Sequence, residues 1–330
     1  MQTKGMRAAL LASAAALALV ALVPAAHADT SFSYQTFGEP GGGQYGAYGI
    51  TDNGTVVGYN LDYALSQYHP ENAFLRNSSG VSSFYQYPGL GTSYGFGAND
   101  NGYIVGQLSN GYGNAFLYNP NAGWSQISYG LNTAARGIND ANQIVGYSTP
   151  ACCGATAFLD VGGTLTTITP PGSLAAWAYA ISNDGKIAGY YENSQGSYEG
   201  FVDAAGSFTT VMAPGALQTE VFGINNAGQL VGMDYVGGAW HGFVDTNGVF
   251  MTPSIPGFSS VIPYGINDSG VITGRASITA IADLIFIGTP VASPDGVPLP
   301  VIGGTIPGGM ILFGWLGRRL SRRKAGHAAP

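Results

Sequence analysis

Short apolar runs alternate with glycine- and asparagine-rich segments along the middle of this chain, and the alternation occurs six times. Each repeat opens with two apolar runs on either side of a polar Asn/Asp-x-Gly type segment. The strings are YGITDNGTVVGY from Tyr48, FGANDNGYIVGQ from Phe96, RGINDANQIVGY from Arg136, YAISNDGKIAGY from Tyr179, FGINNAGQLVGM from Phe222 and YGINDSGVITGR from Tyr264. Because the turn residues tolerate positive φ, each string predicts a tight β-hairpin.

A second anchor follows every string at nearly constant spacing. Phenylalanines occur 42, 42, 43, 42 and 43 residues apart, at Phe74, Phe116, Phe158, Phe201, Phe243 and Phe286. Each phenylalanine lies in a third apolar run, and a glycine-containing turn leads from it to a fourth run such as residues 208–211. A Pro-Gly or glycine-rich link then ends the unit, since proline donates no bond to a β-ladder. The pattern therefore predicts four strands per repeat.

Four-stranded repeats of about 42 residues are typical of propeller blades, which pack face to face around a central axis. The sixth repeat stops after its phenylalanine strand, whereas residues 31–37 form an extra strand-like segment before the first repeat. This N-terminal segment can supply the fourth strand of the last blade and remove two free sheet edges. We therefore predict an all-β fold, a six-bladed β-propeller over residues 29–289 that is closed by its N-terminal strand.

The repeats resemble the HAF family of extracellular repeat proteins, which is named for a His-Ala-Phe triplet after a Gly-Ile-Asn…Val-Gly run. The resemblance covers roughly residues 48–287 and concerns the type of repeat rather than an activity. Only one copy, His241-Gly242-Phe243, keeps the histidine, and the first copy reads Asn72-Ala73-Phe74.

The N-terminus predicts a secretory signal peptide over residues 1–28. Lys4 and Arg7 precede an apolar run, and Ala26-His27-Ala28 matches the small-x-small rule for cleavage between Ala28 and Asp29. The alternative is a membrane anchor, which the short apolar core and the cleavage sequence disfavour. Signal peptidase is the expected partner of this segment.

The C-terminus has three consecutive parts after a linker at 290–296: a motif, an uncharged stretch to Gly317 and a basic cluster, with a short tail at 325–330. The motif is Val297-Pro298-Leu299-Pro300, and the basic residues are Arg318, Arg319, Arg322, Arg323 and Lys324. Residues 297–317 are long enough to cross a bilayer as a helix, and the basic cluster would stay cytoplasmic. The arrangement over 297–324 resembles the VPLPA variant of PEP-CTERM sorting signals, although Val301 stands where alanine is expected. The resemblance implies cutting by an exosortase-type membrane protease after transient anchoring; a permanent anchor is the alternative.

The charge distribution excludes one class of partner. The formal net charge is −7, but residues 29–296 hold only four basic residues against all eighteen acids, a net charge of −14. Such a segment repels phosphate backbones, so no nucleic-acid binding is expected. Cys152 and Cys153 are the only cysteines, so no disulfide framework is expected. This adjacent pair is a candidate vicinal disulfide; the alternative is a reduced pair that binds a metal or a partner.

No recognisable catalytic, metal or cofactor site stands out, and no cofactor is expected. The four histidines show no metal-ligand spacing. Each Asn/Asp turn offers one acid at most, which favours hairpin turns over calcium loops. Glycoside hydrolysis requires a pair of convergent acids. Glu192, Glu199 and Asp203 are candidates, but they belong to one repeat and nothing singles them out. No cysteine lies in a catalytic setting.

An aromatic residue opens five of the six strings, and Arg136 opens the other. We expect these residues to pack between blades; the alternative is a ring near the axis that stacks on sugars, joined by Trp124, Trp177 or Trp240. The leading functional hypothesis is a noncatalytic, exported surface or matrix protein that binds extracellular glycan or another envelope protein. The competing hypotheses are a carbohydrate-active enzyme on the same scaffold, which requires convergent acids on one rim, and a structural matrix protein without a ligand.

Overall fold

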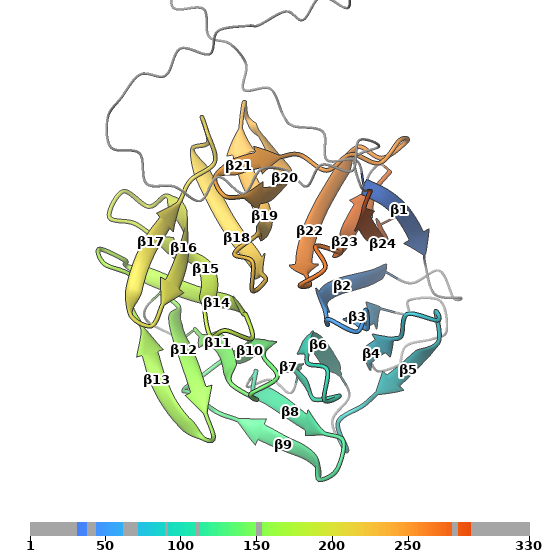
Figure 1. Cartoon of the computed structure of the whole chain (residues 1–330). Coiled ribbons are helices and arrows are strands. Elements are labelled where there is room, and N and C mark those ends of the chain that lie inside the picture. Colours follow the sequence, from blue (N-terminus) through green and yellow to red (C-terminus); the bar gives the residue numbers. More distant parts are fainter. Residues whose placement is uncertain are drawn as a thin grey trace, which may run out of the picture. The chain divides into compact units, whose positions relative to one another are not determined.

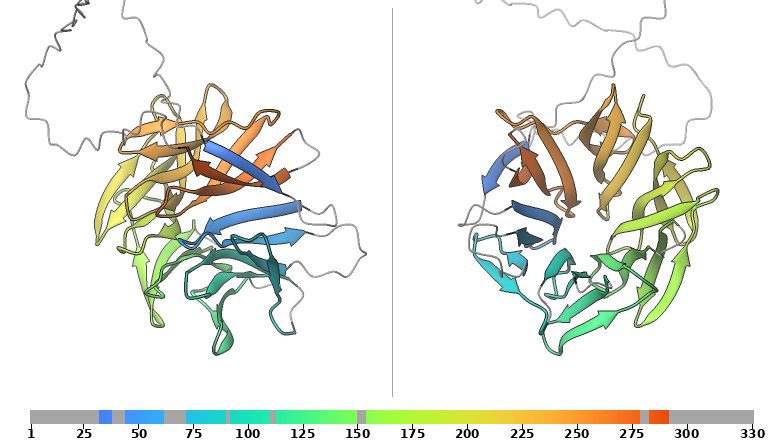
Figure 2. Two further views of the ribbon diagram at one scale, coloured as in Figure 1. Left: turned by 45° about the vertical axis from the view of Figure 1, so that its right-hand side comes forward. Right: turned by 180° about the vertical axis from the view of Figure 1, so that it is seen from behind.

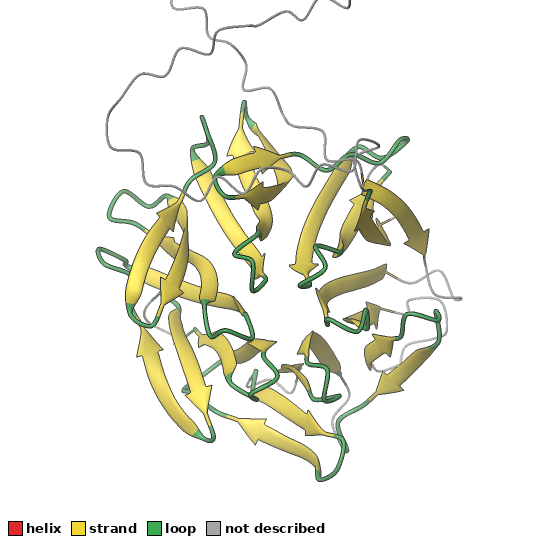
Figure 3. Ribbon diagram, in the orientation of Figure 1, coloured by secondary structure: helices red, strands yellow, loops and turns green. Residues whose placement is uncertain are grey.

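The computed structural model contains six four-stranded antiparallel sheets arranged in a ring (Figures 1 and 3). It describes residues 32–37, 44–61, 72–89, 92–109, 113–149, 154–278 and 283–291. The prediction of a six-bladed all-β propeller is confirmed. In the part of the chain that the structure describes, no helix has the length and apolar character needed to span a bilayer.

Blades 1 to 3 each use four consecutive strands, ordered from the axis outward. Blade 1 consists of β2 (Gln44–Ile50), β3 (Val56–Leu61), β4 (Asn72–Arg76) and β5 (Ser82–Tyr85). Blade 2 consists of β6 (Ser93–Ala98), β7 (Ile104–Leu108), β8 (Ala115–Asn119) and β9 (Gly123–Ile127). Blade 3 consists of β10 (Thr133–Ile138), β11 (Ile144–Ser148), β12 (Thr156–Val161) and β13 (Thr164–Ile168).

Blades 4 and 5 follow the same plan, and blade 6 is built from both ends of the domain. Blade 4 consists of β14 (Ala175–Ile181), β15 (Ile187–Glu192), β16 (Tyr198–Ala204) and β17 (Ser207–Val211). Blade 5 consists of β18 (Gln218–Ile224), β19 (Leu230–Val236), β20 (Ala239–Thr246) and β21 (Val249–Met251). Blade 6 consists of β22 (Ser260–Ile266), β23 (Ile272–Ser277), β24 (Asp283–Pro290) and β1 (Phe32–Phe37).

The ring is closed by the N-terminal strand, as the sequence predicts. β1 pairs antiparallel with β24 over six residue pairs, from Phe32 opposite Pro290 to Phe37 opposite Ile285. Figure 2 shows this strand on the outer edge of the last blade. The ring of Tyr34 covers Phe286 at a centroid distance of 5.9 Å. Closure therefore completes the core of blade 6 as well as its ladder.

The repeated phenylalanine and the glycine of the Val-Gly run are cross-strand partners, which explains why both recur. Gly58 lies opposite Phe74 in blade 1, and the same pairing occurs in all six blades. A Cβ atom on Gly58 would lie 2.0 Å from the carbonyl oxygen of Gly46, so no larger residue fits. All six phenylalanines are at most 1% exposed. Each blade therefore has the same phenylalanine core over a glycine.

Some predicted features lie outside the described residues. These are the signal peptide with its cleavage site, the pair Cys152 and Cys153, and the sorting segment at 297–324. What the sequence indicates for these segments stays a prediction.

Candidate functional site

The central axis is lined by the innermost strand of every blade. Equivalent residues of these strands form layers around the axis, and the layers follow one another from the start of the strand to its hairpin turn. Two cavities lie on the axis, of about 70 Å³ beside the turns and about 80 Å³ deeper inside. They share a layer of apolar residues that consists of Ile50, Ala98, Ile138, Ile181, Ile224 and Ile266. Both are far smaller than the roughly 300–1,000 Å³ of pockets that enclose a drug-sized ligand. A large ligand must therefore bind outside the channel.

The residue that opens each repeat lies at a β-bulge and lines the inner cavity. In blade 1 the register between β2 and β3 shifts between Ala47 and Gly49, so Tyr48 has no partner in the ladder. The same shift occurs in every blade. A bulge leaves the extra residue unpaired and changes the direction of its side chain. The six residues that line the cavity in this way, here called the axial ring, are Tyr48, Phe96, Arg136, Tyr179, Phe222 and Tyr264.

The members of the axial ring contact one another around the full circle. Tyr48 lies 5.4 Å from Phe96 and 5.1 Å from Tyr264, measured between ring centroids. Phe222 lies 5.2 Å from both Tyr179 and Tyr264. The residues thus pack between neighbouring blades, as predicted, and also form a ring at the axis; the stacking of this ring on sugars stays a prediction.

Arg136 completes the ring with its guanidinium group between two aromatic faces. Its Cζ atom lies 4.0 Å from the centroid of Phe96 and 4.7 Å from that of Tyr179. One terminal nitrogen donates to the hydroxyl oxygens of Tyr147 at 3.0 Å and Tyr179 at 3.3 Å. Burial opposes the charge, but these tyrosine oxygens outweigh it and raise the pKa of Arg136. The buried Nε atom has no hydrogen-bond partner.

On the side of the axial ring away from the turns, each blade presents one cross-strand pair of residues, here called the rim. The pairs are Gly46 with Tyr59, Tyr94 with Gln107, Ala134 with Tyr147, Trp177 with Tyr190, Glu220 with Met233 and Ile262 with Arg275. No two pairs are alike, although the strands around them repeat closely. Because these residues differ while the strands around them repeat, the shared fold does not dictate their identity.

The largest aromatic cluster of the rim belongs to blade 4. Trp177 and Tyr190 are stacked with centroids 5.0 Å apart, and Tyr198 contacts both rings edge-on at 5.7 Å and 5.5 Å. All three residues are half-buried. Tyr190 also lies 5.4 Å from Tyr179 of the axial ring, which links the cluster to Arg136. Burial, and then the neighbouring Tyr179, raise the pKa of the Tyr190 hydroxyl.

Glu220 is the one carboxyl group of the rim. Its side chain is 8% exposed, and burial raises its pKa from 4.5 to about 7. The carboxyl group lies near enough to Tyr190 and Tyr179 to raise the pKa of both phenols. A buried acid of this kind is a recognised mark of functional sites, and nothing in its sequence context distinguishes it from the other acids.

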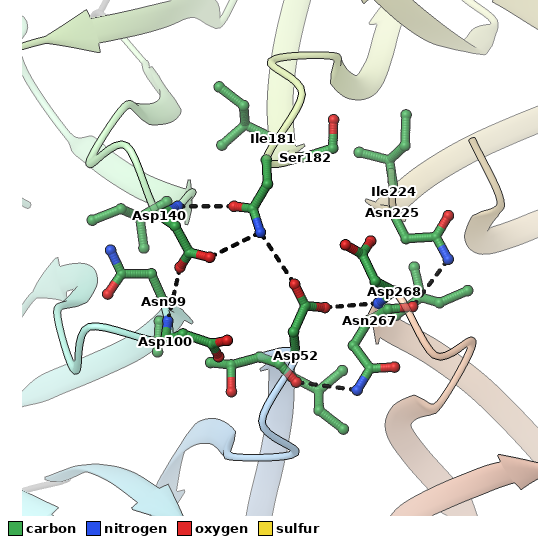
Figure 4. Close-up of a pocket in the computed structure, with 16 residues that line it drawn as sticks. Asp52, Asn99, Asp100, Asp140, Ile181, Ser182, Ile224, Asn225, Asn267 and Asp268 are labelled. Carbon is green, nitrogen blue, oxygen red and sulfur yellow. Dashed lines mark hydrogen bonds between the residues drawn. The ribbon is translucent and has the colours of Figure 1, made fainter. Parts of the chain in front are cut away.

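The hairpin turns at the other end of the channel are joined into a hydrogen-bonded belt (Figure 4). Each turn begins with a side-chain oxygen that accepts the backbone N–H four residues later, as Asn99 does from Tyr103 at 3.0 Å. The next residue of each turn accepts a backbone N–H from the preceding blade at 2.8–3.1 Å. These belt residues are Asp52, Asp100, Asp140, Asn183, Asn226 and Asp268. Because all six blade junctions have this bond, the recurring Asn/Asp residues have a structural role.

The belt also brings together acids from separate turns, each of which has one acid at most. Carboxylate oxygens of Asp52, Asp100 and Asp140 lie within 4.8 Å of one another. Burial raises the pKa of Asp52, and repulsion by the carboxylates of Asp268, Asp100 and Asp140 raises it further. The amide group of Asn183 donates to Asp52 at 3.1 Å and to Asp140 at 2.9 Å. These oxygens are the type that Ca²⁺ prefers, but the cation requires six to eight oxygen ligands, and an amide already occupies part of the site.

The other candidate residues lie apart from the axis. Glu199 accepts hydrogen bonds from Tyr191 at 2.5 Å and from Asn193 at 2.7 Å, and Asp203 accepts the backbone N–H of Gly206 at 2.6 Å. Trp124 packs on Phe116 at 5.1 Å in the outer part of blade 2. Of the three tryptophans named as candidates, only Trp177 contacts the axial ring through a neighbour.

Comparisons with known proteins add the fold only. No protein-family model and no curated protein matches the chain. Among solved structures, the virginiamycin B lyase of Staphylococcus aureus matches at 14% identity and a TM-score of 0.47, covering 79% of this chain and 100% of the lyase. TolB of Acinetobacter baumannii matches at 16% identity and a TM-score of 0.49, covering 62% of this chain and 52%, about half, of TolB. The acylaminoacyl peptidase of Pyrococcus horikoshii matches at 9% identity and a TM-score of 0.49, covering 74% of this chain and 51% of the peptidase. At these identities the chain is similar in fold to proteins of quite different activity.

Proposed function

We propose that this protein is an exported bacterial surface or matrix protein whose propeller binds extracellular glycan without catalysing a reaction. The observation that carries the proposal is the half-buried cluster of Trp177, Tyr190 and Tyr198 at the rim. Such rings combine a flat apolar face with a polar edge, which suits the alternating apolar and hydroxyl surfaces of a sugar. The small axial cavities favour a ligand that lies across the rim.

The proposed location rests on the two ends of the sequence. The leader at 1–28 directs export, and the tail at 297–324 holds the protein transiently at the inner membrane until an exosortase-type protease cuts near Val297. The released propeller is then displayed at the envelope surface or enters the extracellular matrix. An exopolysaccharide or another surface protein is the expected partner there.

The convergence of Asp52, Asp100 and Asp140 is the observation that favours a carbohydrate-active enzyme instead. Against it, every belt residue accepts a backbone N–H from the neighbouring blade, and the adjoining cavity is only about 70 Å³. We expect the purified protein to release no reducing sugar from polysaccharides that it binds. Turnover that disappears in Asp140→Asn, with an unchanged melting temperature, would instead establish the enzyme.

The binding proposal is tested with a panel of bacterial exopolysaccharides and two tryptophan variants. Trp177→Ala removes the centre of the aromatic cluster, whereas Trp240→Ala removes a half-buried tryptophan of blade 5 that contacts only Tyr235 among the described rings. We expect Trp177→Ala to weaken binding by about 5- to 150-fold, since loss of a stacked aromatic ring removes about 1–3 kcal/mol, and Trp240→Ala to leave it unchanged. Equal affinities for both variants would place binding elsewhere. Failure of every glycan to bind would favour the structural matrix protein.

A further inference from the structure

Arg136 is the exception among six equivalent positions. The other five members of the axial ring are tyrosine or phenylalanine, and their rings contact one another directly. An aromatic residue therefore satisfies the fold at this position. The third repeat has instead a long cationic side chain at the same bulge.

This substitution is unfavourable for stability. Among the described residues, no carboxylate lies within 4.0 Å of the Arg136 guanidinium, and its partners are the hydroxyls of Tyr147 and Tyr179 and the neighbouring ring faces. Its buried Nε–H has no acceptor. A buried donor without a partner costs about 1–3 kcal/mol. An arginine also contributes no more apolar contact than the phenylalanine found at this position in two other repeats. Residues that break a repeated structural rule in this way tend to be functional.

We propose that Arg136 binds the carboxylate of an acidic sugar, such as a uronic acid, whose ring stacks on the aromatic cluster of Trp177 and Tyr190. This inference rests on the proposed glycan-binding function and specifies its ligand class. The guanidinium group presents donors in a planar fork that matches a carboxylate.

The dimensions and charges of the site fit this ligand. The inner cavity, lined by Arg136, has about 80 Å³, far less than a pocket that encloses a whole ligand, so only a small group of the ligand enters it. Tyr179 and Tyr190 connect the guanidinium to Trp177 through successive contacts of 4.7, 5.4 and 5.0 Å, so the cation and the aromatic cluster belong to one continuous chain of contacts. In a segment with a net charge of −14, a buried cation with neutral partners is a local positive site.

The test compares trigalacturonic acid with its methyl ester, in which each carboxylate is replaced by an uncharged ester group on the same sugar chain. The full-length protein should bind the acid about 10- to 100-fold more tightly than the ester, because a hydrogen bond to a charged group contributes about 1.5–3 kcal/mol. Arg136→Phe restores the residue type of the other repeats, so it should abolish this preference while the melting temperature stays equal or rises. Arg136→Lys keeps the charge and should retain part of the preference.

Each other outcome overturns the inference. Equal binding of acid and ester, or a preference that persists in Arg136→Phe, would show that Arg136 does not bind the ligand, while glycan binding itself would stand. Failure of both sugars to bind would refute the uronate ligand, and the proposed function would fail as well only if every exopolysaccharide of the panel also failed. If Arg136→Phe does not fold, the folded Arg136→Lys protein is compared with Trp240→Ala instead. An equal preference for the acid over the ester in these two variants would count against the inference.

Discussion

Replacing Glu220 with glutamine should stabilise the protein at neutral and alkaline pH. Burial raises the pKa of this carboxyl group from 4.5 to about 7, so the folded chain holds its proton over a range in which the unfolded chain has lost it. The free energy of unfolding therefore falls as pH rises from about 4.5 to about 7. Above pH 7 the carboxyl group is ionised in the folded state, so the protein is destabilised by the full free-energy cost of burying this charge.

The magnitude follows from the size of the shift. A difference of about 2.5 pKa units corresponds to roughly 3 kcal/mol at about 1.4 kcal/mol per unit, and the side chain is only 8% exposed, so solvent screening is limited. Glu220→Gln keeps the shape but cannot ionise. It should match the wild type at pH 4.5 and exceed it by up to about 3 kcal/mol at pH 8, a rise in melting temperature of roughly 6–12 °C.

The assay is thermal or urea unfolding at several pH values, with Glu192→Gln as the control that removes another carboxyl group of the same protein. The wild type and Glu192→Gln should lose stability together between pH 5 and 8, and Glu220→Gln should show a flatter profile. Parallel profiles for all three proteins would refute the assignment of a raised pKa to Glu220.

Three further outcomes follow from the fold and the termini. Phe116→Ala should destabilise the protein by about 3–5 kcal/mol in urea unfolding, because this fully buried side chain fills the core of blade 2, whereas Phe84→Ala, 51% exposed, should cost under about 1 kcal/mol. Deletion of β1 should broaden the thermal transition seen by circular dichroism, since it removes the six pairs that close the ring; an unchanged transition would contradict closure. Intact-mass analysis of the native protein should give a chain that begins near Asp29 and ends near Val297, and a retained tail would refute sorting.

The strands and their closure could be predicted because they depend on local patterns that recur in every repeat. The spacing of the phenylalanines defines the blades, and the unpaired N-terminal segment indicates how the ring closes. The turn of the third repeat has Asn142 where the other five turns have glycine. Asn142 adopts a φ of 59°, a conformation that asparagine tolerates better than other residues with side chains.

The site could be predicted only in part, because it depends on residues that converge around the axis. The sequence suggests an aromatic ring as an alternative, but the bulge that turns Tyr48 and its counterparts toward the axis has no signature of its own. The acids of the belt come from separate blades, so counting one acid per turn misses their convergence. Comparison of the six repeats with one another is the signal that would have found the rim, since its pairs differ where the strands around them do not.

The central claim is that a glycan stacks on Trp177, and a protein with this tryptophan alone tests it most directly. Replacing Trp124, Trp240 and Trp315 with phenylalanine leaves Trp177 as the single tryptophan of the chain. Titration with a bound exopolysaccharide should then change the tryptophan fluorescence, with saturation at the same Kd that calorimetry gives for the wild type. Binding by calorimetry without any fluorescence change would contradict the claim and place the glycan away from the rim.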